Sequence, residues 1–105
     1  MDFDRRVYLS PDQITQLSIL VPANQWIYDD NETAYIQTIL LPEEYATRVI
    51  AMVDIDMSKA TSETASQFLD SWFLVNRATS SENIVTLFCF TNPPTIDINI
   101  ILEVF

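Results

Sequence analysis

The sequence predicts an α+β fold in which two helices accompany a mostly antiparallel sheet of about five strands. Two stretches place apolar residues at helical spacing, and several shorter stretches alternate apolar and polar residues with period two. The length of 105 residues is that of one domain. We therefore expect a small single domain over residues 1–105 with the element order αβββαββ.

The first helix is predicted over residues 10–20. The segment Ser10–Gln13 has the residue types of a capping box, with a proline at the first helical position. Ile14, Leu17 and Val21 then fall on one face of a helix. A proline directly after Val21 ends it.

A β-hairpin is predicted next, with strands at Gln25–Tyr28 and Ala34–Leu41. The polar segment Asp29–Glu32 separates them. Because the chain has no glycine, this turn has to rely on Asn and Asp side chains that bond to their own backbone.

Residues 42–57 fit two structures. Pro42–Glu44 resembles the start of a helix, because acids suit the first turn. Apolar residues from Val49 to Met57 also alternate with period two, and the segment is poor in strong helix formers. We favour a strand over residues 48–56.

The second helix is predicted over residues 62–76, with Thr61 or Ser62 as its cap. Its apolar residues form a stripe at helical spacing, which we expect to face the core or a dimer partner. The stripe comprises Ala65, Phe68, Leu69, Trp72 and Phe73.

Two strands complete the predicted sheet, one over residues 84–90 and one from Ile96 to about residue 104. The first is continuously apolar, as in a buried strand. In the last strand isoleucines alternate with polar residues. If this strand lies at an edge, Asp97 and Glu103 would protect it from pairing with other chains.

Missing residue types exclude several classes of activity. No histidine is present, which excludes histidine general bases, Ser-His-Asp or Cys-His pairs and histidine metal sites. No glycine is present, which excludes Walker A loops, Rossmann fingerprints and nucleophile elbows. The single cysteine, Cys89, allows no disulfide within the chain and reads as a buried apolar residue. We expect no cofactor, no metal and no enzymatic activity.

The charge favours a protein partner. Fifteen acidic and five basic residues give a net charge of −10. Nucleic acids and anionic membranes both require clustered lysine and arginine, whereas the only basic pair here, Arg5 and Arg6, is flanked by acids. The start of the chain has no apolar signal region, and no span of about 20 apolar residues occurs. We expect a cytoplasmic protein that binds neither nucleic acid nor membrane.

Three groups of residues are candidates for partner binding. The first is an acidic patch in the predicted turn. The second is a pair of aromatic residues beside it, a type enriched at interface cores. The third is a carboxylate pair two residues apart, on one face of the predicted strand. The candidates are Asp29, Asp30 and Glu32, then Trp26 and Tyr28, then Asp54 and Asp56.

The leading hypothesis is a non-catalytic protein that binds a basic partner protein and inhibits or masks it. Nucleic-acid-binding proteins are one class of such partners. In composition the chain resembles small acidic phage inhibitors such as anti-CRISPR proteins, and it also resembles toxin-immunity proteins. The absence of glycine and the compact single-domain composition favour a phage or mobile-element origin. The alternative is a homodimeric chaperone or adaptor, because the order αβββαββ is similar to that of type III secretion chaperones. Those chaperones usually end in a helix, however. A third hypothesis is an enzyme that uses Asp54 and Asp56 with a metal ion.

Overall fold

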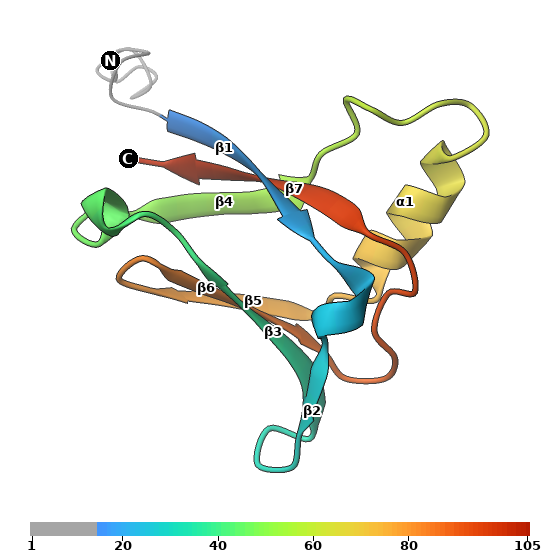
Figure 1. The fold of residues 1–105 in the computed structure, drawn as a ribbon, viewed down its shortest axis with the longest axis horizontal. Helices are drawn as coiled ribbons and strands as arrows, with labels where there is room; N and C mark the ends of the chain where they lie inside the picture. The colour runs from blue at the N-terminus through green and yellow to red at the C-terminus, as the bar shows by residue number, and fades with distance from the viewer. Residues whose placement is uncertain (1–14) are drawn as a thin grey trace, which may run out of the picture.

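Two antiparallel sheets face each other across the core of the molecule (Figure 1). The computed structural model describes residues 15–105. One sheet has three strands in the order β1-β7-β4, and the other has four in the order β2-β3-β6-β5. The strands are β1 (Thr15–Val21), β2 (Ile27–Asp29), β3 (Ala34–Leu40), β4 (Ile50–Ile55), β5 (Arg77–Ser81), β6 (Ile84–Cys89) and β7 (Ile98–Val104).

The predicted α+β class is confirmed, but its detail was wrong. The described residues hold seven strands where about five were expected. They hold one α-helix, α1 (Ala65–Phe73), and two short 3₁₀ turns, η3 (Ala23–Gln25) and η4 (Glu43–Tyr45). The order αβββαββ therefore fails at its first element, which is a strand, and it lacks β5 between α1 and the last two strands. Those two strands, predicted over residues 84–90 and from Ile96 to about residue 104, are confirmed as β6 and β7.

The helix predicted over residues 10–20 is the largest error. Residues 15–20 belong to β1, and residues 10–14 lie outside the described part of the chain. Leu17, Ile19 and Val21 face the core, whereas the residues between them are exposed. This alternation has the period of a strand. Although the apolar residues also have helical spacing, pairing of β1 with β7 satisfies the backbone hydrogen bonds of this segment as a strand.

The predicted hairpin is confirmed, because β2 and β3 pair antiparallel. Its first strand begins two residues later than expected, after η3. The favoured strand over residues 48–56 is also confirmed as β4. Only the three residues of η4, beside the alternative helix start, take a helical turn.

β7 is the central strand of its sheet, flanked by β1 and β4. The edge position considered for it is therefore wrong. Ile98, Ile100, Leu102 and Val104 alternate inward and are all buried. Because β7 donates to partners on both sides, it is the best anchored strand of this sheet.

β5 was not predicted, because Arg77–Ser81 has no apolar alternation and is exposed along its whole length. The strand forms by pairing with β6 across the two-residue turn Glu82–Asn83. Glu82 takes the left-handed conformation there, with φ of 55°. That conformation is usually left to glycine, which this chain lacks.

The second predicted helix is confirmed as α1, shorter than expected. The residue before α1 is Thr64, so the expectation that Thr61 or Ser62 is its cap was wrong. The Thr61 hydroxyl instead accepts hydrogen bonds from the N–H groups of Glu63 and Thr64 in the turn that precedes the helix. Its apolar stripe divides in two. Phe68 and Trp72 pack against the core, whereas Phe73 is 72% exposed.

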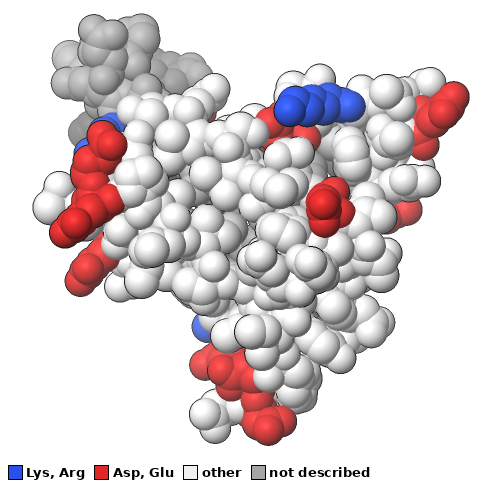
Figure 2. Space-filling view, viewed as in Figure 1, with Lys and Arg blue, Asp and Glu red and all other residues white. Residues whose placement is uncertain are grey.

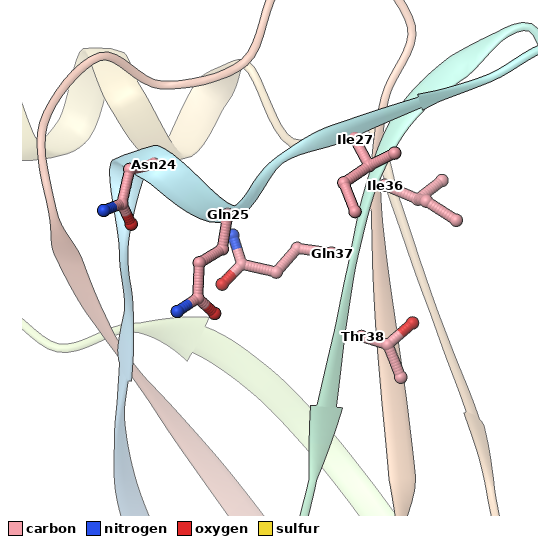
Figure 3. A pocket seen from close by; sticks show the side chains of 6 residues that line it. All are labelled: Asn24, Gln25, Ile27, Ile36, Gln37 and Thr38. Carbon is pink, nitrogen blue, oxygen red and sulfur yellow. The ribbon is translucent and has the colours of Figure 1, made fainter.

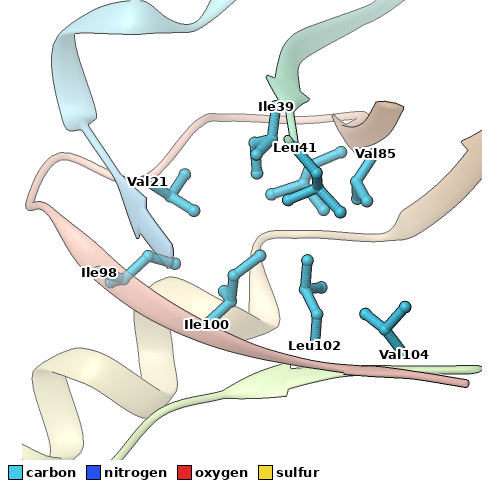
Figure 4. Close-up of a cluster of buried hydrophobic side chains, with 9 residues drawn as sticks. Val21, Ile39, Leu41, Val85, Ile98, Ile100, Leu102 and Val104 are labelled. Atoms are coloured by element: carbon cyan, nitrogen blue, oxygen red, sulfur yellow. The ribbon is translucent and has the colours of Figure 1, made fainter. Parts of the chain in front are cut away.

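Nine apolar side chains from both sheets form the buried core (Figure 4). They come from the inner faces of β1, β3, β6 and β7 and from the residue after β3. Their contact holds the two sheets together, so the outer faces of both sheets remain available to solvent. The cluster comprises Val21, Ile39, Leu41, Val85, Leu87, Ile98, Ile100, Leu102 and Val104.

Candidate functional site

The acidic patch predicted at Asp29, Asp30 and Glu32 lies in the turn between β2 and β3. Asp29 Oδ1 accepts hydrogen bonds from the backbone N–H groups of Asn31, at 2.8 Å, and Glu32, at 3.1 Å. Asp29 therefore holds the turn together, as expected for an Asx turn. Asp30 and Glu32 are both exposed, and Glu32 lies 3.7 Å from the Arg77 guanidinium, so Asp30 is the exposed carboxylate of the turn without an ion pair among the described residues.

The two aromatic candidates are divided between the core and the surface. Trp26 is half-buried against the core cluster, and its indole Nε1 is buried without a hydrogen-bond partner among the described residues. Tyr28 is exposed and packs edge-on against Tyr35, with ring centroids 5.1 Å apart. Of the two, Tyr28 is the one that a partner could reach.

Asp54 and Asp56 share the outer face of the three-stranded sheet, as predicted. Asp54 lies opposite Ile101 of β7. Asp56 reaches across the sheet, where its Oδ2 accepts a hydrogen bond of 2.7 Å from the Ser18 hydroxyl. Glu103 lies on the same face and accepts a hydrogen bond from the Gln16 side chain. We call Asp54, Asp56 and Glu103 the acidic face.

Asp56 is the most tightly held carboxylate of the acidic face. Hydrogen bonds from the Ser18 hydroxyl and from the backbone N–H and side chain of Ser58 lower its pKa below the ordinary value of 3.8. Lys59 adds a smaller effect in the same direction. Asp56 is therefore charged throughout the physiological pH range.

The predicted candidates do not form one site. Two lie on the acidic face, whereas the turn carboxylates lie at the end of the other sheet. Figure 2 shows acidic side chains in separate groups around a wide area without charge, with one group where Figure 1 places the β2–β3 turn. Among residues 15–105, no three His, Cys, Asp or Glu side chains gather closely enough to hold a metal ion.

The outer face of the four-stranded sheet contrasts with the acidic face, and sequence reasoning did not single it out. Its side chains are aliphatic and aromatic residues, threonines and a serine, and the one basic residue among them, Arg77, lies over the Phe88 ring at 4.1 Å. We call this surface the neutral face. It comprises Ile27, Ile36, Thr38, Leu40, Arg77, Thr79, Ser81, Ile84, Thr86 and Phe88.

A cavity of about 470 Å³ opens where η3 meets β3 (Figure 3). Asn24 and Gln25 line it from η3, and Gln37 points toward them from β3. The Gln37 side chain is buried, and its Nε2 donates to the Pro22 carbonyl at 3.1 Å. In the sequence, the only sign of this cavity was an amide side chain, Gln37, within a mostly apolar strand.

Cys89 is buried, as expected from its apolar surroundings. Burial raises the pKa of its thiol to about 11. The thiol is therefore protonated at neutral pH and is a poor nucleophile. Within the described residues, no helix is long and apolar enough to cross a membrane.

Comparison of the chain with protein-family models, with curated proteins and with solved structures gives no match.

Proposed function

We propose that the protein is a non-catalytic binding protein that engages a basic surface of a partner protein and thereby inhibits or masks it. The observation that carries this proposal is the location of its charge. No acidic side chain in residues 15–105 is buried. Between described residues there is one ion pair, Glu32 with Arg77 at 3.7 Å. The excess negative charge therefore faces solvent, where it can attract a basic partner.

The two arginines among residues 15–105 make contacts that leave most of this negative charge unbalanced. Arg48 donates to the Thr15 hydroxyl and the Val104 carbonyl, and it lies 5.6 Å from the Tyr45 ring centroid. Arg77 covers Phe88. Arg77 therefore balances one carboxylate, Glu32, and most of the other acidic side chains have no ion pair among the described residues.

Salt dependence tests the proposal. We would capture proteins from host lysate at low and at physiological ionic strength and identify them by mass spectrometry. A basic protein captured at low salt and released at higher salt supports the proposal, because salt screens exposed charges. A partner whose affinity does not change with salt would overturn it.

Matched charge variants then locate the contact. Removing two charges with Asp30→Asn and Glu32→Gln leaves Asp29 to hold the turn. The control removes two charges elsewhere, with Glu63→Gln just before α1 and Asp70→Asn within it, and changes the net charge by the same amount. If the turn contacts the partner, the first pair slows association several-fold more than the second. Equal slowing would assign the effect to net charge alone.

The alternative function, a homodimeric chaperone or adaptor, is favoured by one observation. Phe73 of α1 is 72% exposed, and Leu69 one turn earlier is also exposed. An exposed aromatic residue of this kind suits an apolar contact. Sedimentation of the chain and of Phe73→Ser tests it: a dimer that the substitution dissociates, and that resists salt, would support the adaptor.

A further inference from the structure

Half of β3 lacks a partner on one side. β3 has seven residues, but β2 pairs only with Ala34, Tyr35 and Ile36. Among the described residues, the backbone of Gln37–Leu40 pairs with β6 alone. We call Gln37–Leu40 the open edge of β3. Within residues 15–105, no segment occupies the strand position beside it, in line with β2, because the chain turns away through η3.

The open edge has none of the features that usually prevent pairing with other chains. Its four residues include no charge and no proline, and β3 contains no bulge where it pairs with β6. The neutral face has exposed aliphatic side chains at this edge. Leu40, within the open edge, is 72% exposed, and Ile27, on β2 beside it, is 69% exposed. An edge of this kind is suited to accept an additional strand.

The cavity beside η3 gives such a strand room for side chains. It is lined by Thr38 of the open edge and by Ile27 and Ile36 on the neutral face. The amides of Asn24 and Gln25 form its other wall (Figure 3). Strand addition gains affinity from backbone hydrogen bonds and specificity from pockets for alternate side chains.

Acidic residues lie at both ends of the open edge. Beyond Leu40 the chain enters η4, where Glu43 and Glu44 are exposed. At the other end, Asp97 Oδ1 accepts a hydrogen bond of 2.8 Å from the Ala23 backbone N–H, which places this carboxylate at η3. A neutral centre with acidic ends is complementary to an extended segment with an uncharged centre and basic flanks.

We propose that an extended segment of a basic partner protein adds to the open edge of β3 as an antiparallel strand in line with β2. Alternate side chains of the segment enter the cavity beside η3, and basic residues before it contact Glu43 and Glu44. The inference rests on the proposed function, because it names the part of the basic partner that the protein recognises.

A synthetic peptide tests the geometry directly. The probe is a blocked heptapeptide, Lys-Lys-Thr-Val-Thr-Val-Thr, and its control carries N-methyl groups on alternate residues, which removes backbone donors. Amide hydrogen exchange of the protein is followed by NMR. The amides of Gln37–Leu40 that face away from β6 should gain protection with the probe and none with the control. Binding without that protection would overturn strand addition.

Two threonine variants provide a matched pair. Thr38 and Thr79 are both exposed and share one row across the neutral face, Thr38 on the open edge and Thr79 on β5. Thr38→Lys should weaken peptide binding by about tenfold or more, because it places a like charge beside the basic segment. Thr79→Lys makes the same net change and should weaken it by less than about twofold. Equal effects would contradict the proposal.

Two further outcomes separate this inference from the proposed function. If a peptide with Ser-Ser in place of Lys-Lys protects the open edge equally and without salt dependence, the edge accepts strands and the basic partner is wrong. If the lysine peptide binds in a salt-dependent way elsewhere, the electrostatic function stands and the inference fails. Protection of the open edge that rises with protein concentration alone would assign it to a second copy of the chain.

Discussion

The two sheets of this protein are assembled in opposite ways. The four-stranded sheet is built from two hairpins of consecutive strands, β2 with β3 and β5 with β6. The three-stranded sheet has no pair of consecutive strands, because β7 at the end of the described chain pairs with both β1 and β4. Local pairs close short loops, whereas pairing of β1 with β7 closes a loop of most of the described chain and costs more chain entropy.

The outer faces of the two sheets differ as well. The face built on long-range pairs has Asp54, Asp56 and Glu103, whereas the neutral face is aliphatic and rich in threonine. Under the proposed function, charge on one face would attract a basic partner over distance. The other face, with the open edge of β3 beside it, would offer short-range contacts. The two proposals therefore place attraction and recognition on separate surfaces.

The largest expected effect tests whether the long-range sheet anchors the core. Ile100 is completely buried on the inner face of β7, and its neighbour Ile101 lies on the outer face. Ile100→Ala should lower the free energy of unfolding by about 2–5 kcal/mol, the usual result of truncating a buried isoleucine. Ile101→Ala removes the same atoms from a half-buried position and should cost about 1 kcal/mol or less. Urea unfolding measures both, and similar losses would contradict the assignment of inner and outer faces.

Most of the four-stranded sheet could be predicted from sequence, and much of the three-stranded sheet could not. β2, β3 and β6 have strong local signals, namely β-branched runs separated by polar turns. β1 was predicted as a helix because Ile14, Leu17 and Val21 also fit helical spacing. Only the pairing of β1 with β7, which is distant in the sequence, decides between the two.

The candidate surfaces were predictable in the same uneven way. Asp54 and Asp56 were placed on one face correctly, because strand alternation determines that face. The contribution of Glu103 to it depends on the position of β7, which the sequence did not reveal. The open edge follows from a difference in length between β2 and β3, and the turn into η3 that creates it has no clear sequence signal.

The next largest effect is expected in the β2–β3 hairpin of the four-stranded sheet, where one turn residue has a strained backbone. Thr33, in the β2–β3 turn, has φ of 54°, an uncommon conformation for a β-branched residue. Thr33→Gly should raise the free energy of unfolding by about 1 kcal/mol, because glycine adopts that conformation without steric cost. Thr38→Gly, in the extended part of β3, should lower it by about 0.5–1 kcal/mol. Thermal unfolding of both variants measures whether each one gains or loses stability. A loss of stability in both variants would show that Thr33 is not strained.

The smallest effect expected is on the acidic face, at the half-buried Asp56. The hydrogen bonds from Ser18 and Ser58 hold the pKa of Asp56 below 3.8, so the folded protein binds this proton less readily than the unfolded chain. The stabilisation is therefore complete above the unfolded pKa and is lost as the pH falls through the lowered native one. Asp56→Asn should destabilise the protein slightly at neutral pH, and the difference from the wild type should disappear in acid. Asp54→Asn removes the same charge from the same face but touches neither serine. If urea unfolding between pH 2 and about pH 7 gave both variants the same profile, relief of charge repulsion, not the hydrogen bonds of Asp56, would account for the result.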